Sequence, residues 1–138
     1  VIYPKFFEGE QAASLDNTFH GSEFGAIVTI RLADDTREAS YRFLNALNLC
    51  TRAASVGDLF TGIVHPATAT HRELSPKQRE KIGVTEGLIR ISVGIEDVND
   101  IIADIEQALA VSTACGSERQ KSAGTVEHTS AAATWKEI

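Results

Sequence analysis

The sequence predicts an α+β fold, a small two-layer domain in which helices cover one face of a mainly antiparallel sheet. Two observations support this prediction. Short apolar runs typical of strands alternate along the chain with longer segments whose apolar residues recur at helical spacing. The length also agrees, because 138 residues correspond to about one domain and 43% apolar residues are enough for an ordinary core.

The first strand is expected at residues 24–32, FGAIVTIRL. This stretch is rich in β-branched and aromatic residues and follows a turn signal, His20-Gly21-Ser22. We interpret it as a largely buried strand. Residues 1–23, which precede it, show no clean period and are interpreted as a linker or interdomain segment.

A helix is expected over residues 34–50. Asp35, with Glu38 three residues later, forms an Asp-type variant of the capping box that marks a helix start. The segment predicts an amphipathic helix, because its apolar residues fall on one face. These residues are Ala39, Phe43, Ala46, Leu47 and Cys50.

A short strand and a short helix follow. Gly62-Ile63-Val64 is an apolar run that ends at His65-Pro66, and a residue before proline prefers extended geometry. The segment Ser75-Pro76-Lys77-Gln78 predicts a helix start, with Ser as the cap and Pro at the first helical position. Gly83 marks the end of this helix.

The second clear strand is expected at residues 88–93. Successive side chains of a strand point to opposite faces of the sheet. Ile89, Ile91 and Val93 therefore share one face. Leu88, Arg90 and Ser92 share the other.

The last helix is expected from Asp97, its cap, to about Ala110. Its apolar residues form one stripe, consisting of Val98, Ile101, Ile102, Ile105, Ala108 and Leu109. From Val111 to Ile138 the period is lost, and this stretch is predicted to be a poorly ordered or weakly packed extension. The predicted domain therefore covers residues 24–110.

Composition argues against several classes of function. The net charge is −6 and the 13 Lys and Arg residues are scattered, so nucleic-acid binding is not expected. The apolar runs are too short to span a membrane, and residues 1–7 do not resemble a signal peptide. Cys50 and Cys115 suggest no disulfide framework. A cytoplasmic protein is expected.

Arg90 is the first candidate for a binding role. A guanidinium fixed on a rigid strand can bind a carboxylate through two parallel hydrogen bonds. The pattern alone favours an ordinary role, either an exposed Arg on a half-solvated sheet or one paired with a core acid. Ser55, just before Gly57-Asp58, is by itself typical of a turn residue whose hydroxyl bonds to nearby backbone.

The other polar residues do not predict a site. His65 and His71 flank a Pro-containing loop without further metal ligands at suitable spacing, so hydrogen bonding within the loop is expected and no metal. Glu96, Asp97 and Asp100 lie at a helix N-terminus, where the helix dipole favours acids. The sequence has neither a G-x-S-x-G elbow nor a glycine-rich phosphate loop.

Three segments together resemble a known family. They are Ser55-Val56-Gly57-Asp58, then residues 65–71, HPATATH, and then residues 87–97, GLIRISVGIED. In order and spacing they resemble the C-terminal domain of the Cys/Met-metabolism PLP-dependent enzymes. This family includes cystathionine γ-synthase, cystathionine lyases, methionine γ-lyase and O-acetylhomoserine sulfhydrylase. The resemblance extends from about Phe24 to Leu109.

The resemblance implies the fold-type I architecture of PLP-dependent transferases, in which a large domain binds pyridoxal 5'-phosphate (PLP) and a small C-terminal domain closes over the substrate. Arg90 matches the family Arg that binds the substrate α-carboxylate. Ser55 matches a Ser that helps to position the substrate and the cofactor-bearing lysine. The implied reaction is γ-elimination or γ-replacement (sulfhydrylation) on methionine- or homoserine-derived substrates, with PLP as the electron sink. The implied partners are the amino-acid substrate, an N-terminal PLP-binding domain and further subunits of a homo-oligomer, a tetramer in the family.

The chain also departs from the family pattern. The family's PLP lysine lies upstream, and none of the lysines here matches its Ser-x-Thr-Lys context; they are Lys5, Lys77, Lys81, Lys121 and Lys136. Tyr3-Pro4 matches a family Tyr-Pro, but Phe7-Glu8-Gly9-Glu10 stands where the family has Ser-His-Pro. The chain alone is therefore expected to be inactive. The alternative function is that of a truncated non-catalytic remnant or a partner-binding module that lacks the PLP domain.

Overall fold

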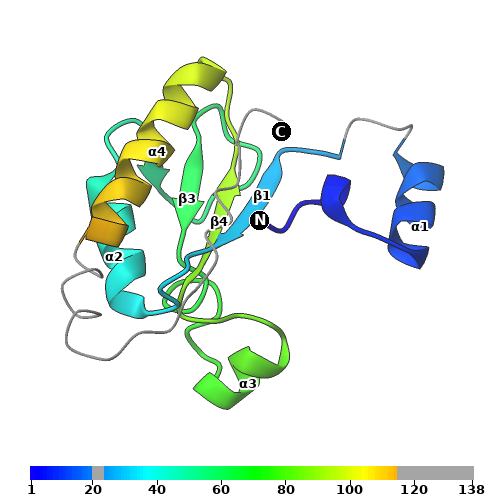
Figure 1. The fold of residues 1–138 in the computed structure, drawn as a ribbon, viewed down its shortest axis with the longest axis horizontal. Coiled ribbons are helices and arrows are strands. Elements are labelled where there is room, and N and C mark those ends of the chain that lie inside the picture. The colour runs from blue at the N-terminus through cyan, green and yellow to red at the C-terminus, as the bar shows by residue number, and fades with distance from the viewer. Residues whose placement is uncertain (20–23, 115–138) are drawn as a thin grey trace.

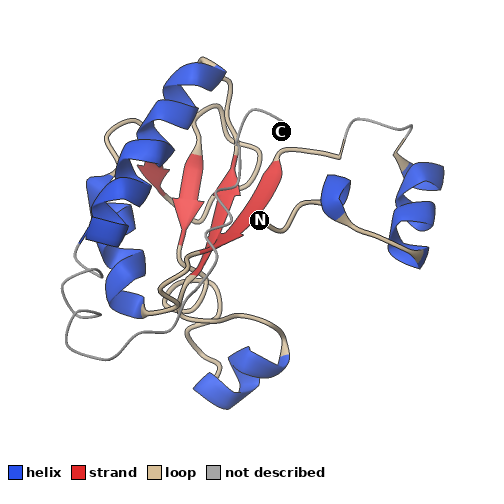
Figure 2. Ribbon diagram, viewed as in Figure 1, coloured by secondary structure: helices blue, strands red, loops and turns tan. Residues whose placement is uncertain are grey.

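The structure, a computed structural model, describes residues 1–19 and 24–114. Two helices, α2 (Arg37–Ala46) and α4 (Val98–Ala114), cover one face of a sheet (Figures 1 and 2). The strands lie in the order β1 (Ile27–Arg31), β4 (Leu88–Ser92), β3 (Gly62–Val64) and β2 (Thr51–Arg52). β1 and β3 run antiparallel to β4, whereas β2 is parallel to β3. The predicted two-layer α+β fold with a mainly antiparallel sheet is confirmed.

β4 lies at the centre of the sheet and separates its two faces. Ile89 and Ile91 point into the core beneath the helices and are 0% and 2% exposed. Leu88 belongs to a separate small apolar cluster. The predicted alternation is therefore confirmed, and it places Arg90 on the face that α2 and α4 leave open.

The core lies between the sheet and the two helices. All five apolar residues predicted for the face of the first helix pack there, with Phe43 fully buried. In α4, Ile101, Ile105 and Ala108 are buried in the same core. Val98 is 61% exposed, so its assignment to the apolar stripe was wrong. It is the first residue of α4 and lies at the end of the helix, away from the core cluster.

The start of α2 differs from the prediction. Thr36 caps the helix, because its hydroxyl accepts a hydrogen bond from the Ala39 N–H at 3.2 Å. The Asp35 carboxylate accepts instead from the N–H of Gly87, just before β4. The prediction of Asp35 as the cap was wrong because a charge-assisted bond to a distant segment takes the place of the local one.

α2 ends at Ala46 rather than at Cys50, because the next segment is held by a carboxylate of α4. Asp104 accepts hydrogen bonds from the backbone N–H groups of Asn48, Leu49 and Cys50 at 2.8, 2.9 and 2.8 Å. Burial raises the pKa of Asp104, but these donors outweigh it and keep the pKa below its ordinary value. Burial, and then the nearby Asp104, raise the pKa of the Cys50 thiol to about 12, so this thiol stays protonated.

Two other elements show what the sequence pattern can and cannot predict. β2 was not predicted, because its two residues, Thr51 and Arg52, are both exposed and show no apolar period. α3 (Pro76–Lys81) begins as predicted, with the Gln78 side chain accepting from the Ser75 N–H at 2.9 Å. Gly83 follows this helix with a φ of +76°, a conformation that favours glycine.

The N-terminal segment contains two helical elements that the pattern does not predict. They are η1 (Pro4–Phe6) and α1 (Glu10–Thr18), and α1 lies to one side of the two-layer body (Figure 1). Ile2 pairs with Thr29 on the outer edge of β1. The Tyr3 hydroxyl donates to the Gly25 carbonyl at 2.9 Å. These contacts attach the start of the chain to the edge of the sheet.

α4 continues through Ala114, past the predicted end at Ala110. The predicted extension from Val111 therefore begins as helix, and its remainder, residues 115–138, lies outside the described residues. Within residues 1–19 and 24–114, no helix has the length and apolar character needed to cross a membrane.

Replacing Asp104 by Ala should lower the free energy of unfolding of the 138-residue chain by about 2–4 kcal/mol, because one buried and two partly buried backbone donors lose their acceptor. Asp104→Asn, which keeps one acceptor oxygen, should cost less. Glu106→Ala is the matched control, because Glu106 is an exposed acid of the same helix and should change stability by less than about 0.5 kcal/mol. Urea unfolding followed by circular dichroism measures all three. Equal midpoints for Asp104→Ala and Glu106→Ala would contradict the role of Asp104.

Candidate functional site

Arg90 lies in the middle of β4, on the open face of the sheet. It pairs with Thr29 of β1 on one side and with Val64 of β3 on the other. The side chain is half-buried, and its Nε atom is fully covered. Strand pairing on both sides fixes the backbone of Arg90, and a rigid backbone is what a precise binding residue requires.

The guanidinium of Arg90 has hydrogen-bonding capacity to spare. Within the described residues its Nε has no partner, and its Nη2 donates two long hydrogen bonds, 3.3 Å to the Ala54 carbonyl and 3.5 Å to the Ser55 carbonyl. No carboxylate in that part of the chain forms an ion pair with it, so pairing with a core acid is excluded there. A covered donor without an acceptor costs free energy, and an incoming carboxylate would supply the acceptor.

Ser55 lies beside Arg90, in the loop of residues 53–61 that joins β2 to β3, here called the Ser55 loop. Its carbonyl contacts Arg90, and its hydroxyl donates to the Asp58 carboxylate at 2.9 Å. Asp58 also accepts from the Leu59 N–H at 3.1 Å. The structure therefore brings both predicted residues together and adds Asp58. The sequence signal that could have identified Asp58 is a carboxylate three residues after a serine in a glycine-containing turn.

The strand that carries Arg90 also holds the Ser55 loop. Ser92, which is 3% exposed, accepts a hydrogen bond from the Gly57 N–H at 3.2 Å. Farther along, the Gly94 N–H donates to the Thr61 hydroxyl at 3.0 Å. Ser92 was placed on the face of Arg90 but was not considered for a role. Its burial and its bond to Gly57 are visible only in the structure, and the sequence shows only that it shares a face with Arg90.

Glu96 fixes the end of the Ser55 loop. Its carboxylate accepts from the Thr61 N–H at 2.6 Å and from the Thr61 hydroxyl at 2.9 Å. These bonds, the one from the backbone foremost, hold the pKa of Glu96 below its ordinary value. Position 94 requires a glycine, because a Cβ there would lie 2.5 Å from the Phe60 carbonyl carbon. Glu96 therefore has a tertiary role beyond the helix-dipole role predicted for it.

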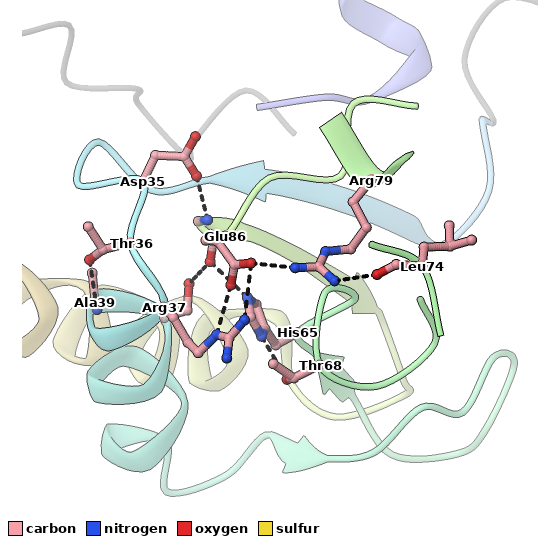
Figure 3. A network of polar contacts seen from close by, with 11 residues as sticks. Asp35, Thr36, Arg37, Ala39, His65, Thr68, Leu74, Arg79 and Glu86 are labelled. Atoms are coloured by element: carbon pink, nitrogen blue, oxygen red, sulfur yellow. Dashed lines mark hydrogen bonds and ion pairs between the residues drawn. The ribbon is translucent and has the colours of Figure 1, made fainter. Parts of the chain in front are cut away.

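A second group of polar contacts fixes the turn that precedes β4 (Figure 3). The Glu86 carboxylate accepts from Arg37 Nε at 2.9 Å and from Arg79 Nη2 at 2.7 Å. Its backbone carbonyl accepts from the Ser40 hydroxyl and from His65 Nε2, both at 2.7 Å. One residue thus joins α2, α3 and the loop after β3. The bond from Arg37 foremost, with that from Arg79, lowers the pKa of Glu86 to about 2.

His65 and His71 hydrogen-bond within their loop, as expected. Nδ1 of His65 lies 2.8 Å from Thr68 Oγ1, and Nδ1 of His71 lies 2.9 Å from Thr70 Oγ1. Because Nε2 of His65 faces a carbonyl oxygen, that nitrogen carries a hydrogen. The described part of the chain contains no group of three His, Cys, Asp or Glu side chains that could hold a metal ion.

The small α+β domain, with Arg90 on its open face, is consistent with what comparison with known families finds. The family model described as Cys/Met metabolism PLP-dependent enzyme matches residues 1–110. The chain belongs to this family, and its domain is part of a fold-type I architecture. The match starts at residue 1, earlier than the 24–109 over which the sequence motifs suggested the resemblance.

Individual relatives agree with this assignment. An L-methionine gamma-lyase of Fusobacterium nucleatum subsp. polymorphum is 48% identical over 87 residues, 63% of this chain and 22% of that protein. An O-succinylhomoserine sulfhydrylase of Pseudomonas aeruginosa is 40% identical over 89 residues, 64% of this chain and 22% of that protein. The chain spans about a fifth of the length of these curated relatives.

Solved structures give the same picture. A cystathione gamma lyase from Micromonospora echinospora has a TM-score of 0.70 and 37% identity, covering 78% of this chain and 27% of that one. A Campylobacter jejuni protein assigned as an O-acetylhomoserine (thiol)-lyase has a TM-score of 0.70 and 31% identity, covering 78% and 25%. The latter structure contains an N'-pyridoxyl-lysine-5'-monophosphate residue.

The described residues do not fit PLP itself. A lysine that reacts with a carbonyl cofactor needs a lowered pKa, which burial or a neighbouring cation provides. The lysines within residues 1–19 and 24–114 are Lys5, Lys77 and Lys81, and all three side chains are exposed. Within this part of the chain, no lysine therefore has the burial that a reaction with PLP requires.

Glu86→Gln should destabilise the 138-residue chain by about 2 kcal/mol near neutral pH, because Arg79, with a side chain 7% exposed, loses its carboxylate. The ordinary pKa of a Glu is 4.5 and that of Glu86 in the fold is about 2. The contribution of the Glu86 carboxylate to stability is therefore complete above the ordinary pKa and is lost as the pH falls from 4.5 toward 2. Thermal unfolding of wild type and variant between these pH values measures the difference.

Glu73→Gln is the control for this experiment, because the Arg72–Glu73 pair is 72% and 86% exposed and should contribute almost nothing. If the difference in stability between wild type and Glu86→Gln stayed constant across the acid range, the lowered pKa of Glu86 would be contradicted.

Proposed function

We propose that residues 24–110 form the substrate-closing C-terminal domain of a PLP-dependent enzyme that catalyses γ-elimination or sulfhydrylation on a methionine- or homoserine-derived substrate. The observation that carries this proposal is Arg90, half-buried on the open sheet face with a covered Nε that has no partner among the described residues. Family membership supports the cofactor, and the lyases and sulfhydrylases among the relatives support the reaction class.

Arg90 binds the α-carboxylate of the substrate in this proposal. The planar guanidinium offers paired donors that match the two carboxylate oxygens, so one side chain supplies both charge and orientation. Ser55 lies next to it and has a hydroxyl that donates to Asp58. When the substrate is bound, this hydroxyl positions the ligand at the same end. Orientation by a group that does not react is an efficient way to lower the barrier of the step that follows.

The remaining parts of the enzyme are supplied from outside this chain in the proposal. An N-terminal domain holds PLP and its lysine, and the active enzyme is a homo-oligomer. The choice between elimination and replacement depends on whether a thiol or sulfide enters after the γ-substituent has left. Assaying the full-length protein with L-methionine alone, and with O-succinylhomoserine plus sulfide, distinguishes the two reactions by their products.

Arg90→Ala in the full-length enzyme should raise the KM for L-methionine by on the order of 30- to 900-fold, which corresponds to losing about 2–4 kcal/mol of a charge-assisted contact. L-Methionine amide, which lacks the carboxylate, should inhibit wild type and variant equally. Arg72→Ala is the control, because Arg72 lies in an exposed pair away from β4. Unchanged KM in Arg90→Ala would refute the carboxylate-binding role.

The 138-residue chain alone should not retain PLP. After mixing with PLP and dialysis, its absorbance in the visible range should match that of a control protein without a cofactor site, because no described lysine is buried. Stoichiometric, borohydride-fixable PLP on the chain would overturn the proposal that the cofactor site lies outside it.

A further inference from the structure

Several hydrogen bonds attach the Ser55 loop to the rest of the domain. Its start is attached at Ala53, whose N–H donates to the Ile63 carbonyl at 3.1 Å, and Leu59 accepts from the Ile95 N–H at 3.0 Å. The end of the loop is attached at Thr61, which bonds to Glu96 and Gly94. Its middle is attached at Gly57, which donates to the Ser92 hydroxyl at 3.2 Å. Ser55 lies between the attachments at Ala53 and Gly57, two residues from each. The position of Ser55 therefore depends on the Gly57–Ser92 contact more directly than on the bonds at Thr61.

The burial and the strand position of Ser92 favour this contact. The residue is 3% exposed and lies on β4 between Ile27 of β1 and Gly62 of β3, so its backbone cannot shift independently. A buried hydroxyl needs a hydrogen-bond partner, and here it accepts from a loop rather than from the sheet. Gly57 has a φ of +75°, a left-handed conformation that turns the loop sharply after Ser55.

Ser92 and Arg90 act on the same loop from the same strand face. Arg90 donates to the carbonyl groups of Ala54 and Ser55, while Ser92 accepts from the N–H of Gly57. Residues next but one on a strand share a face, so these two side chains contact the loop from the same side, Arg90 at residues 54 and 55 and Ser92 at residue 57. If a substrate carboxylate takes over the Arg90 guanidinium, the Ser92 bond is the contact with β4 near Ser55 that does not depend on Arg90.

We propose that Ser92 is a positioning residue for substrate binding, which keeps Ser55 at the Arg90 site when Arg90 is engaged with the substrate carboxylate. This inference rests on the proposed function of Arg90 and Ser55. Ser92 does not touch the substrate. It acts through Gly57, and its loss leaves Ser55 present but no longer held beside the carboxylate.

The test uses the full-length enzyme and L-methionine. Ser92→Ala should raise KM about fivefold, the effect of losing about one neutral hydrogen bond, with kcat within about twofold of wild type. In the Ser55→Ala background, Ser92→Ala should add no further increase, because its effect passes through Ser55. Ser112→Ala is the matched control: Ser112 is also 3% exposed, but its hydroxyl donates to Leu109 within α4. That variant should lower the melting temperature without changing KM.

The outcomes separate the two proposals. If Ser92→Ala lowers only the melting temperature, as Ser112→Ala does, Ser92 is merely structural and the inference is overturned. It is also overturned if the KM increases of Ser92→Ala and Ser55→Ala multiply in the double variant. If Arg90→Ala and Ser55→Ala leave KM unchanged, the proposed function fails and this inference with it. Should Ser92→Ala not fold, Ser92→Cys replaces it, because the thiol keeps the shape of the side chain, although it is larger, and its sulfur is a weak acceptor. It should also raise KM.

Discussion

The alternation of side chains along β4 is the constraint on which the rest of the domain depends. Ile89 and Ile91 enter the core beneath α2 and α4. Arg90, which lies between them in the chain, and Ser92, which follows them, face the open side. Pairing with β1 and β3 prevents any one-residue shift, because such a shift would place apolar residues outside and the guanidinium inside. The same five residues therefore define both the packing of the core and the direction of the candidate site.

Carboxylates connect the loops to this frame where regular backbone pairing is missing. Asp104 holds the segment after α2, Glu86 joins the turn before β4 to α2 and α3, and Glu96 holds the end of the Ser55 loop. Each acts as an acceptor for groups from another element, and each has a pKa below its ordinary value in the fold. The three contributions are thus present at neutral pH, and each weakens on acidification, when the carboxylate is protonated.

The regular elements were predictable from the sequence, and the tertiary hydrogen bonds were not. Periodicity located β4, α2 and α4, since apolar spacing reflects burial directly, and capping residues located α3. It could not show that Asp35 would bond to Gly87 and leave Thr36 as the cap, because that choice depends on a segment about fifty residues away. β2 escaped prediction since neither of its residues is buried. For the site, Arg90 stood out as a charge within an apolar strand, whereas the role of Ser92 required the position of the Ser55 loop.

The placement of the site on a core strand has a consequence for how this domain can vary. Arg90 has buried isoleucines on both sides in the chain, so a cavity at either one moves the backbone that aims the guanidinium. On the proposed function, the carboxylate that Arg90 binds is remote from the bond that breaks, and its contribution is orientation, which depends steeply on distance. If Arg90 binds the substrate as proposed, core packing at Ile89 and Ile91 therefore affects substrate binding as well as stability. An arginine on a loop would make substrate binding independent of core packing, whereas an arginine on β4 makes the two depend on each other.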